Sequence, residues 1–273
     1  MSRLEMSANI FLHELRQLRR SFVTWSAALL AVIFVFFSLF TSFTKDAALM
    51  NELLARFPQE LRAAFGLANM DLATIEGYFA FSFVFCQLLM AIQAAGYGFG
   101  LLSLDESELR ADFLLSKPVS RPNILTSKLA AALVSLLITN LALTLGTFSA
   151  IALFRGETVY NPGAILLVLL SGFLFQLVFL GVSLALSLTA RRIHSVTPYA
   201  LGLAFGTYVL NAFSGVIGEV KLELLTPFKH FDPGYIVRHQ AFDTPFVLAD
   251  MALVIIAVGL SYWLYQHRDI PAV

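Results

Sequence analysis

Residues 105–128 read DESELRADFLLSKPVSRPNILTSK and lie between two long apolar segments. The stretch gathers acidic and basic side chains in a chain of 273 residues of which only 13% are charged. The chain is 58% hydrophobic, whereas a soluble domain is about 45–50% apolar and about 25% charged. Because such an excess of apolar side chains needs an apolar solvent, the composition predicts a polytopic membrane protein.

The apolar segments on both sides of this stretch are long enough to cross a bilayer, which takes about 20 mostly apolar residues. Backbone groups in lipid must be satisfied within their own segment, and no ten-residue alternation suggests a barrel. We therefore predict an all-α polytopic membrane protein, one domain over residues 1–273. Its six transmembrane helices are expected at residues 23–43, 78–104, 129–154, 164–190, 196–217 and 246–265.

The basic side chains predict the orientation, because Lys and Arg in short connections are retained on the cytoplasmic side. An amino terminus inside the cell puts the larger share of the 18 Lys and Arg there. That share includes those of RQLRR at 16–20 and ARRIH at 190–194. Both termini and residues 105–128 are then predicted to be cytoplasmic.

Residues 1–22 form an amphipathic pattern ahead of the first span. Phe11, Leu15, Leu18 and Phe22 fall on one helical face, and arginines lie elsewhere around the helix. We expect a helix that lies in the cytoplasmic membrane surface and continues into the first span. A solvated helical overhang is the alternative.

Two connections, 44–77 and 218–245, are too long for simple turns, and both are predicted outside. In the first, NELLARFPQELRAAFGL at 51–67 predicts two short helices on the outer surface. In the second, Phe228, Phe231, Tyr235 and Phe242 of LLTPFKHFDPGYIVRHQAF suit an interfacial aromatic belt.

The sequence lacks the motifs of an enzyme or a metal protein. HELRQ at 13–17 has no second histidine four residues on, and the other four histidines are scattered, so no metal site is expected. G-x-x-x-x-G-K-[ST] is absent, so the chain is not expected to hold ATP. A net charge of zero offers no basic face for nucleic acid. In GYGFG, Gly96 and Gly100 are spaced for close helix packing.

Uncharged amides interrupt the apolar spans. They can bond across helices or line a solute path, and both readings stay open. Asp250, near the outer start of the last span, is the one acid expected close to membrane depth, where such groups are functional candidates. The amides are Gln87, Gln93, Asn140, Gln176 and Asn211.

Residues 105–128 themselves predict a stiff, charged elbow. Glu106 and Glu108 precede Arg110 on a helix that can extend the second span into water. Pro118 disfavours helix at the residue before it, and Ser120, ahead of a proline in the first turn, can cap the next helix. Such an elbow has the shape of a docking surface.

At these residues the sequence resembles the permease subunits of ABC transporters of the ABC-2 type. Those proteins carry an acidic residue after the second span, a short helix, LLS.PVSR, an apolar residue and a lysine that starts the third span. Ala111-Asp112 stands here where many members have Gly-Thr. The matching residues are Glu106 or Glu108, Leu114, Leu115, Ser116, Pro118, Val119, Ser120, Arg121, Ile124 and Lys128.

The resemblance implies a prokaryotic plasma-membrane exporter in which a separate ATPase subunit holds ATP-Mg. This chain would bind no cofactor, form the substrate path and pair with a second permease copy or a homologue. A coupled carrier, an intramembrane enzyme and a membrane scaffold are the alternatives. The residues implied in ATPase coupling are Glu106, Glu108, Arg110, Leu114, Leu115, Pro118, Arg121 and Lys128.

Overall fold

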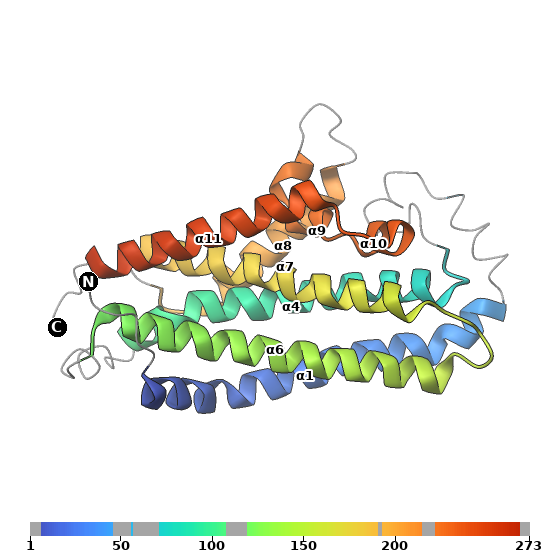
Figure 1. Cartoon of the computed structure of the whole chain (residues 1–273), viewed down its shortest axis with the longest axis horizontal. Helices are drawn as coiled ribbons and strands as arrows, with labels where there is room; N and C mark the ends of the chain where they lie inside the picture. Colours follow the sequence, from blue (N-terminus) through green and yellow to red (C-terminus); the bar gives the residue numbers. More distant parts are fainter. Residues whose placement is uncertain are drawn as a thin grey trace.

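Five long helices form the body of the protein. The computed structural model describes residues 7–45, 56, 71–107, 119–190, 193–214 and 222–267, and within them the chain forms helices and no strands. The five helices run side by side along the long axis (Figure 1). They are α1 (Ala8–Lys45), α4 (Ile75–Ser107), α6 (Arg121–Phe154), α7 (Pro162–Thr189) and α11 (Thr244–His267).

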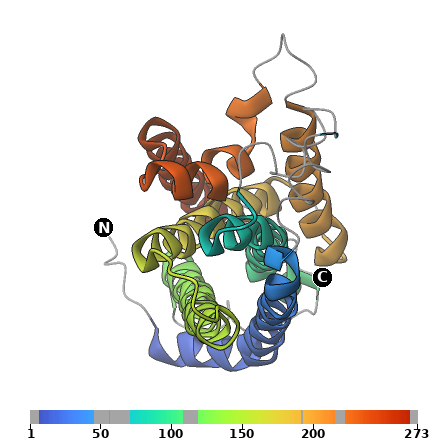
Figure 2. The ribbon, with the colours of Figure 1, turned by 90° about the vertical axis from the view of Figure 1, so that its right-hand side faces the viewer.

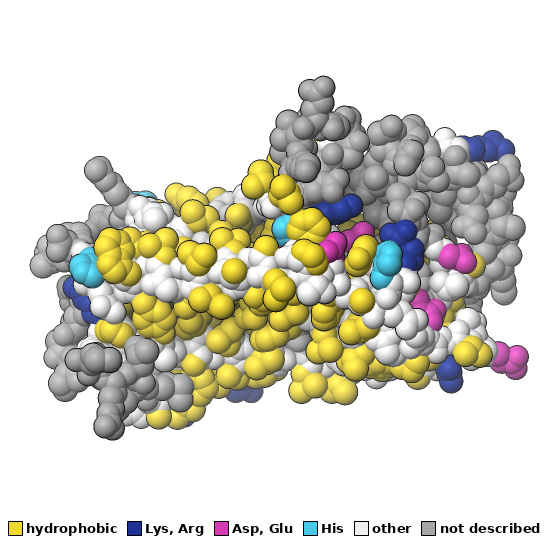
Figure 3. Space-filling view, turned by 45° about the horizontal axis from the view of Figure 1, so that its top comes forward, with side chains coloured by type: hydrophobic (Ala, Val, Ile, Leu, Met, Phe, Trp, Pro, Cys, Tyr) yellow, Lys and Arg dark blue, Asp and Glu magenta, His cyan; other side chains and the backbone are white. Residues whose placement is uncertain are grey.

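These five helices are long and apolar enough to cross a membrane, judged by length and composition among the described residues. They correspond to five of the six predicted spans. Hydrophobic side chains cover much of the face seen in Figure 3. On α11, the large apolar side chains of Leu248, Ile255 and Trp263 are exposed. A surface of this kind suits a lipid solvent, so the predicted all-helical membrane fold is confirmed for this part of the chain.

The fifth predicted span, 196–217, corresponds to α8 (Val196–Ser214), which is not among the five. Its 19 residues give a length of about 28 Å, slightly less than the hydrocarbon core of about 30 Å. Figure 2 shows α8 from the side while α6 is seen nearly end-on, so α8 is inclined to the main axis. Residues 215–217 lie outside the described residues.

The amphipathic amino-terminal segment is part of α1 and not a separate helix. Figure 2 shows its first turns running across the bundle, whereas the later turns run along it. Leu18 of the predicted apolar stripe packs against the main hydrophobic core, and Phe11, Leu15 and Phe22 are half-buried. Part of the stripe therefore contacts protein, so lipid need not cover all of it.

The third span begins earlier than predicted. Helix α6 starts at Arg121, so the last eight residues of the predicted elbow form its first two turns. Ser120 occupies the N-cap with extended backbone, but its side chain makes no capping hydrogen bond. The predicted position of the cap is thus confirmed and its side-chain contact is wrong. Pro122 lies in the first turn, where a backbone N–H has no partner within the helix, so the missing N–H of proline costs nothing there. Its fixed φ angle favours the start of the helix.

Helix α4 packs against both α7 and α8, and Gly98 lies at a close approach to α7. A Cβ atom there would overlap the side-chain oxygen of Ser183 and lie 2.6 Å from the carbonyl oxygen of Leu180. A Cβ on Gly96 would meet nothing within 4 Å. The prediction that Gly96 provides close helix packing is therefore wrong, because this glycine faces a cavity and Gly98 faces α7.

The segment before α11 folds back into the bundle. It forms η1 (Leu222–Leu225), α9 (Pro227–His230) and α10 (Pro233–His239). Phe228 and Phe231 are 3% and 0% exposed, with ring centroids 4.9 and 6.1 Å from that of Phe175. For these two residues the predicted aromatic belt is wrong, since the turns at Pro227 and Pro233 direct the rings inward. The helices predicted within 51–67 lie outside the described residues except at position 56.

The close approach of α4 and α7 predicts that Gly98→Ala destabilises the protein whereas Gly96→Ala does not. Overpacking a well-packed contact costs about 1–3 kcal/mol, and the Gly96 position has room for a methyl group. Thermal unfolding of the purified protein in detergent should show a midpoint several degrees lower for Gly98→Ala. Equal midpoints for both variants would contradict this assignment.

Candidate functional site

The first turns of α6 are joined to α1 by a buried ion pair. Lys128 Nζ lies 2.5 Å from Glu14 Oε1, and the Lys128 side chain is only 2% exposed. Close by, the backbone N–H of Ser7 donates to Ser127 Oγ at 2.9 Å. These contacts bring the start of α1 against the start of α6, although the two segments are more than 100 residues apart.

The same turns of α6 are joined to the end of α11. Arg121 Nη1 donates to the carbonyl oxygens of Tyr265 and Gln266 at 3.2 and 3.5 Å. A cation at the last carbonyls of a helix interacts favourably with its dipole. Thr126 Oγ1 and the hydroxyl of Tyr262 are 2.8 Å apart. We call the end of the bundle where α1 and α6 begin and α11 ends the proximal end (Figure 1).

The structure describes only part of the predicted coupling elbow. Glu106 lies in the last turn of α4, and Arg121 and Lys128 lie in the first two turns of α6. Lys128 faces the protein interior and contacts Glu14, so its side chain is not presented to a docked partner. Glu108, Arg110, Leu114, Leu115 and Pro118 lie outside the described residues.

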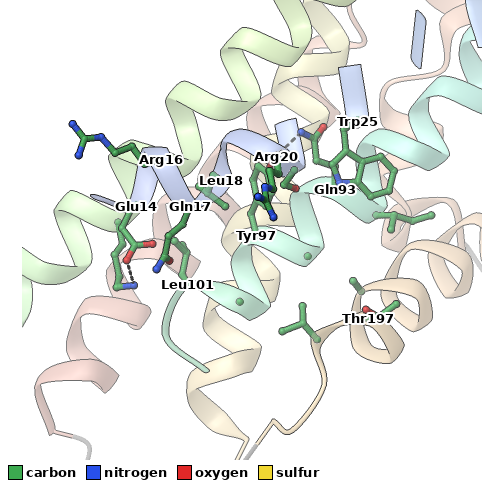
Figure 4. A pocket seen from close by; sticks show the side chains of 17 residues that line it. Glu14, Arg16, Gln17, Leu18, Arg20, Trp25, Gln93, Tyr97, Leu101 and Thr197 are labelled. Atoms are coloured by element: carbon green, nitrogen blue, oxygen red, sulfur yellow. Dashed lines mark hydrogen bonds and ion pairs between the residues drawn. The ribbon is translucent and has the colours of Figure 1, made fainter. Parts of the chain in front are cut away.

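A cavity of about 680 Å³ opens at the proximal end between α1, α4, α6 and α8. Its α1 wall is mostly polar, and its α4 and α8 walls are mostly apolar. Gly96 and Gly100, which were predicted to provide helix packing, both line it. Figure 4 shows the side chains that surround it. They include Glu14, Arg16, Gln17, Arg20, Trp25, Gln93, Tyr97, Lys128 and Thr197.

Three of the five predicted amides form one connected network behind this cavity. Gln176 Nε2 donates to Gln93 Oε1 at 3.2 Å, and Asn140 Nδ2 donates to Gln176 Oε1 at 2.6 Å. Gln93 Nε2 donates to Thr139 Oγ1 at 3.0 Å and to the Tyr97 hydroxyl at 3.3 Å. Since Gln93 also lines the cavity, polar groups continue from the cavity into the contact of α4, α6 and α7.

The other two amides lie elsewhere. Gln87 Nε2 donates to the carbonyl oxygen of Phe231 at 2.8 Å, which satisfies a buried backbone acceptor in the turn after α9. Asn211 is half-buried in α8. The structure therefore places three of the five amides in one network and the other two outside it, a distinction that the sequence did not provide.

Asp250 is not the isolated acid that the sequence indicated. Its Oδ2 lies 2.9 Å from His230 Nδ1, both side chains are nearly buried, and the imidazole stacks on Phe246 at 4.6 Å. The pair joins α9 to the second turn of α11. In the turn beside it, Asp232 accepts from the N–H of Gly234 at 2.9 Å. Burial raises the pKa of the Asp232 carboxyl.

The sequence model of the ABC-2 family transporter protein matches residues 8–270. The chain belongs to the ABC-2 transporter family. It is thus a multi-pass membrane permease of an ABC transporter, a kind of subunit that is generally non-catalytic. Comparison with curated proteins gave no match. Within the described residues of this ABC-2 permease, no group of three or more His, Cys, Asp and Glu could hold a metal ion.

Sequence reasoning missed several residues of the ABC-2 permease cavity. Glu14 was considered only as part of an incomplete zinc motif, yet a single acid among the arginines of α1 is a usable signal for an ion pair. Arg20 and Trp25 were assigned to the membrane surface and the first span. Nothing in their spacing indicates a cavity, because the opposite wall comes from α4 and α8.

The buried ion pair predicts a strong effect of Lys128→Met, which leaves Glu14 buried without its partner. Breaking such a pair costs about 3–5 kcal/mol, so the thermal midpoint and the yield of folded ABC-2 permease should fall sharply. The exchange Glu14→Lys with Lys128→Glu should recover part of the loss. Arg19→Met, at an exposed position of α1, is the matched control. An exchange variant no more stable than either single variant would contradict a direct pairing.

Proposed function

We propose that this chain is the permease subunit of an ATP-driven exporter that works with a separate ATPase subunit. The ATPase would hold ATP-Mg, and this chain would bind no cofactor of its own. A second permease copy or a homologue would complete the membrane part. The match of the ABC-2 family over residues 8–270 carries the proposal, and the motif in residues 105–128 supports the ATPase contact.

The contacts of α6 support a coupling role for the elbow. The chain leaves the elbow through the first turns of α6, where Arg121 binds α11 and Lys128 binds Glu14 of α1. A displacement of this segment by a docked ATPase would act on α1 and α11 directly, without a flexible connection. In this proposal the nucleotide-driven motion of the ATPase reaches the membrane helices by that route.

The position of the cavity supports export. The proximal end carries Arg16, Arg19 and Arg20 of α1, and the distribution of basic residues predicts that this end faces the cytoplasm. A cavity open there would load cargo from the cytoplasm or the inner leaflet. Transport would then move the cargo outward.

The amide network supports a path that continues from the cavity. Asn140 Oδ1 is buried and has no hydrogen-bond partner among the described residues. An unpaired buried acceptor is costly, and it is tolerated where water or a passing solute reaches it. We propose that Gln93, Gln176 and Asn140 line the path, whereas Gln87 supports the turn after α9.

We also propose that α8 crosses the membrane, so that the permease has six spans with both termini cytoplasmic in a prokaryotic plasma membrane. In a Cys86→Ser background, single cysteines at Ser107 and Ser195 should react with impermeant maleimide only from the cytoplasm. Those at Asn69 and Lys221 should react only from outside. Labelling of Ser195 and Lys221 from the same side would contradict a crossing by α8.

Docking through the elbow predicts that Glu106→Lys with Glu108→Lys prevents capture of the ATPase. Like charges that meet in a desolvated contact cost several kcal/mol, and each 1.4 kcal/mol is a factor of ten in affinity. Co-purification with a co-expressed ABC ATPase subunit that the parent permease captures, followed by ATP hydrolysis of the complex, measures the effect.

Glu157→Lys, at an exposed position between α6 and α7, is the matched control and should leave capture unchanged. Arg121→Glu is unsuitable as the main test because it also removes the contact with α11. Normal capture and hydrolysis in the double variant would mean that the elbow is a solvated loop.

A further inference from the structure

The charges around the proximal cavity do not cancel. Four charged side chains line it, and Lys128 is neutralised by its contact with Glu14. The guanidinium groups of Arg16 and Arg20 are exposed and have no acidic or hydrogen-bonding partner among the described residues. The cavity therefore carries an excess of positive charge and favours an anion.

The two arginines occupy different parts of the cavity wall. In Figure 4, Arg20 lies in the middle of the lining side chains, between the Glu14 pair on one side and Gln93 on the other. Arg16 projects away from them, at the rim. A guanidinium presents several fixed donors that match phosphate oxygens, so Arg20 can hold a phosphate group inside the cavity, and Arg16 adds positive charge at the rim.

Apolar and aromatic side chains form the remaining wall. Trp25, Ile92, Leu101, Val196 and Ala200 line the cavity together with the arginines. Its volume of about 680 Å³ lies within the range of about 300–1,000 Å³ of small-molecule sites. A wall that is cationic on one side and apolar on the other fits a ligand with an anionic head and a hydrocarbon body.

The cavity also lies where a lipid can enter from the side. Helices α1 and α8 both pack on α4, but within the described residues they have no extensive contact with each other. Trp25 belongs to a residue type enriched at the headgroup level of membranes. The arginines of α1 lie where anionic lipid of the inner leaflet attracts basic side chains, given the orientation proposed above.

We propose that this cavity binds the phosphate-bearing headgroup of an anionic amphiphile from the inner leaflet, held by Arg20 beside Trp25 and attracted by Arg16 at the rim. This deepens the proposed function by naming the substrate class, and it rests on that function for the orientation. The binding test below contains no ATPase. A failure to bind lipid and a failure to capture the ATPase are therefore separate results.

Trp25 provides the probe. The chain has two tryptophans, so Trp263→Phe leaves Trp25 as the single one. The variant is placed in nanodiscs of phosphatidylcholine with a rising fraction of phosphatidylglycerol whose acyl chains are brominated near the headgroup, since bromine quenches tryptophan on contact. Quenching should saturate at a fraction of brominated phosphatidylglycerol about tenfold below that needed with brominated phosphatidylcholine. Equal quenching by the two lipids would overturn the proposal.

Substitutions on one helix separate the cavity from the general attraction of basic residues to anionic lipid. The double variant Arg16→Gln with Arg20→Gln should raise the fraction of brominated phosphatidylglycerol that gives half-maximal quenching about tenfold. This corresponds to a loss of about 1.4 kcal/mol in binding free energy. Arg19→Gln, which removes an exposed charge of α1 that does not line the cavity, should leave it unchanged. An equal effect of Arg19→Gln would overturn the proposal.

Two further arms complete the test. Arg20→Lys keeps the charge and should keep most of the preference for phosphatidylglycerol over phosphatidylcholine. A thermal unfolding midpoint equal to that of the parent shows that each variant is folded. Soluble glycerol phosphate distinguishes a lipid headgroup from a free phosphate compound. If it reverses the quenching at millimolar concentration, the cavity binds soluble phosphate compounds and the amphiphile assignment is wrong.

Discussion

Polar and charged groups at membrane depth must find partners inside the protein, because lipid offers none. Three polar contacts between separate parts of the described chain meet this requirement. Lys128 is paired with Glu14, His230 with Asp250, and Gln87 with the carbonyl oxygen of Phe231. Each contact joins helices that have no covalent connection nearby. The requirement for satisfied polar groups therefore specifies which helices are neighbours, and apolar packing then fills the space between them.

The same requirement distinguishes structural polar groups from those of the cavity. Gln87 uses its donor on a backbone acceptor that would otherwise be buried and unpaired. Arg20 inside the cavity and Arg16 at its rim instead have no acidic partner among the described residues, since Glu14 is paired with Lys128. In the amide network, Asn140 keeps an acceptor without a described partner. An incompletely satisfied polar site that adjoins an open cavity is the arrangement expected of a site that changes occupants.

The start of α6 is where the two proposals meet. Lys128 lines the cavity and closes the ion pair, and Arg121, two turns earlier, binds the end of α11. The end of the elbow and one residue of the cavity wall thus belong to one short helical segment, which also contacts the last span. An ATPase that moved this segment would change the shape of the cavity in the same step, which is the link that an ATP-driven exporter needs.

The sequence by itself predicted the five helices that are long and apolar enough to cross a membrane, because this property depends on the composition of about 20 neighbouring residues. It also determined the family through the motif around Pro118 and Arg121. It named Gln93, Gln176 and Asn140 as candidates, but it could not separate them from Gln87 and Asn211. Only the tertiary structure decided that Gly98 and not Gly96 provides close packing, that Phe228 and Phe231 turn inward, and that Glu14 meets Lys128. Those outcomes depend on how each helix is rotated against neighbours distant in the chain, and rotation is set by the sum of many packing contacts that no local pattern records.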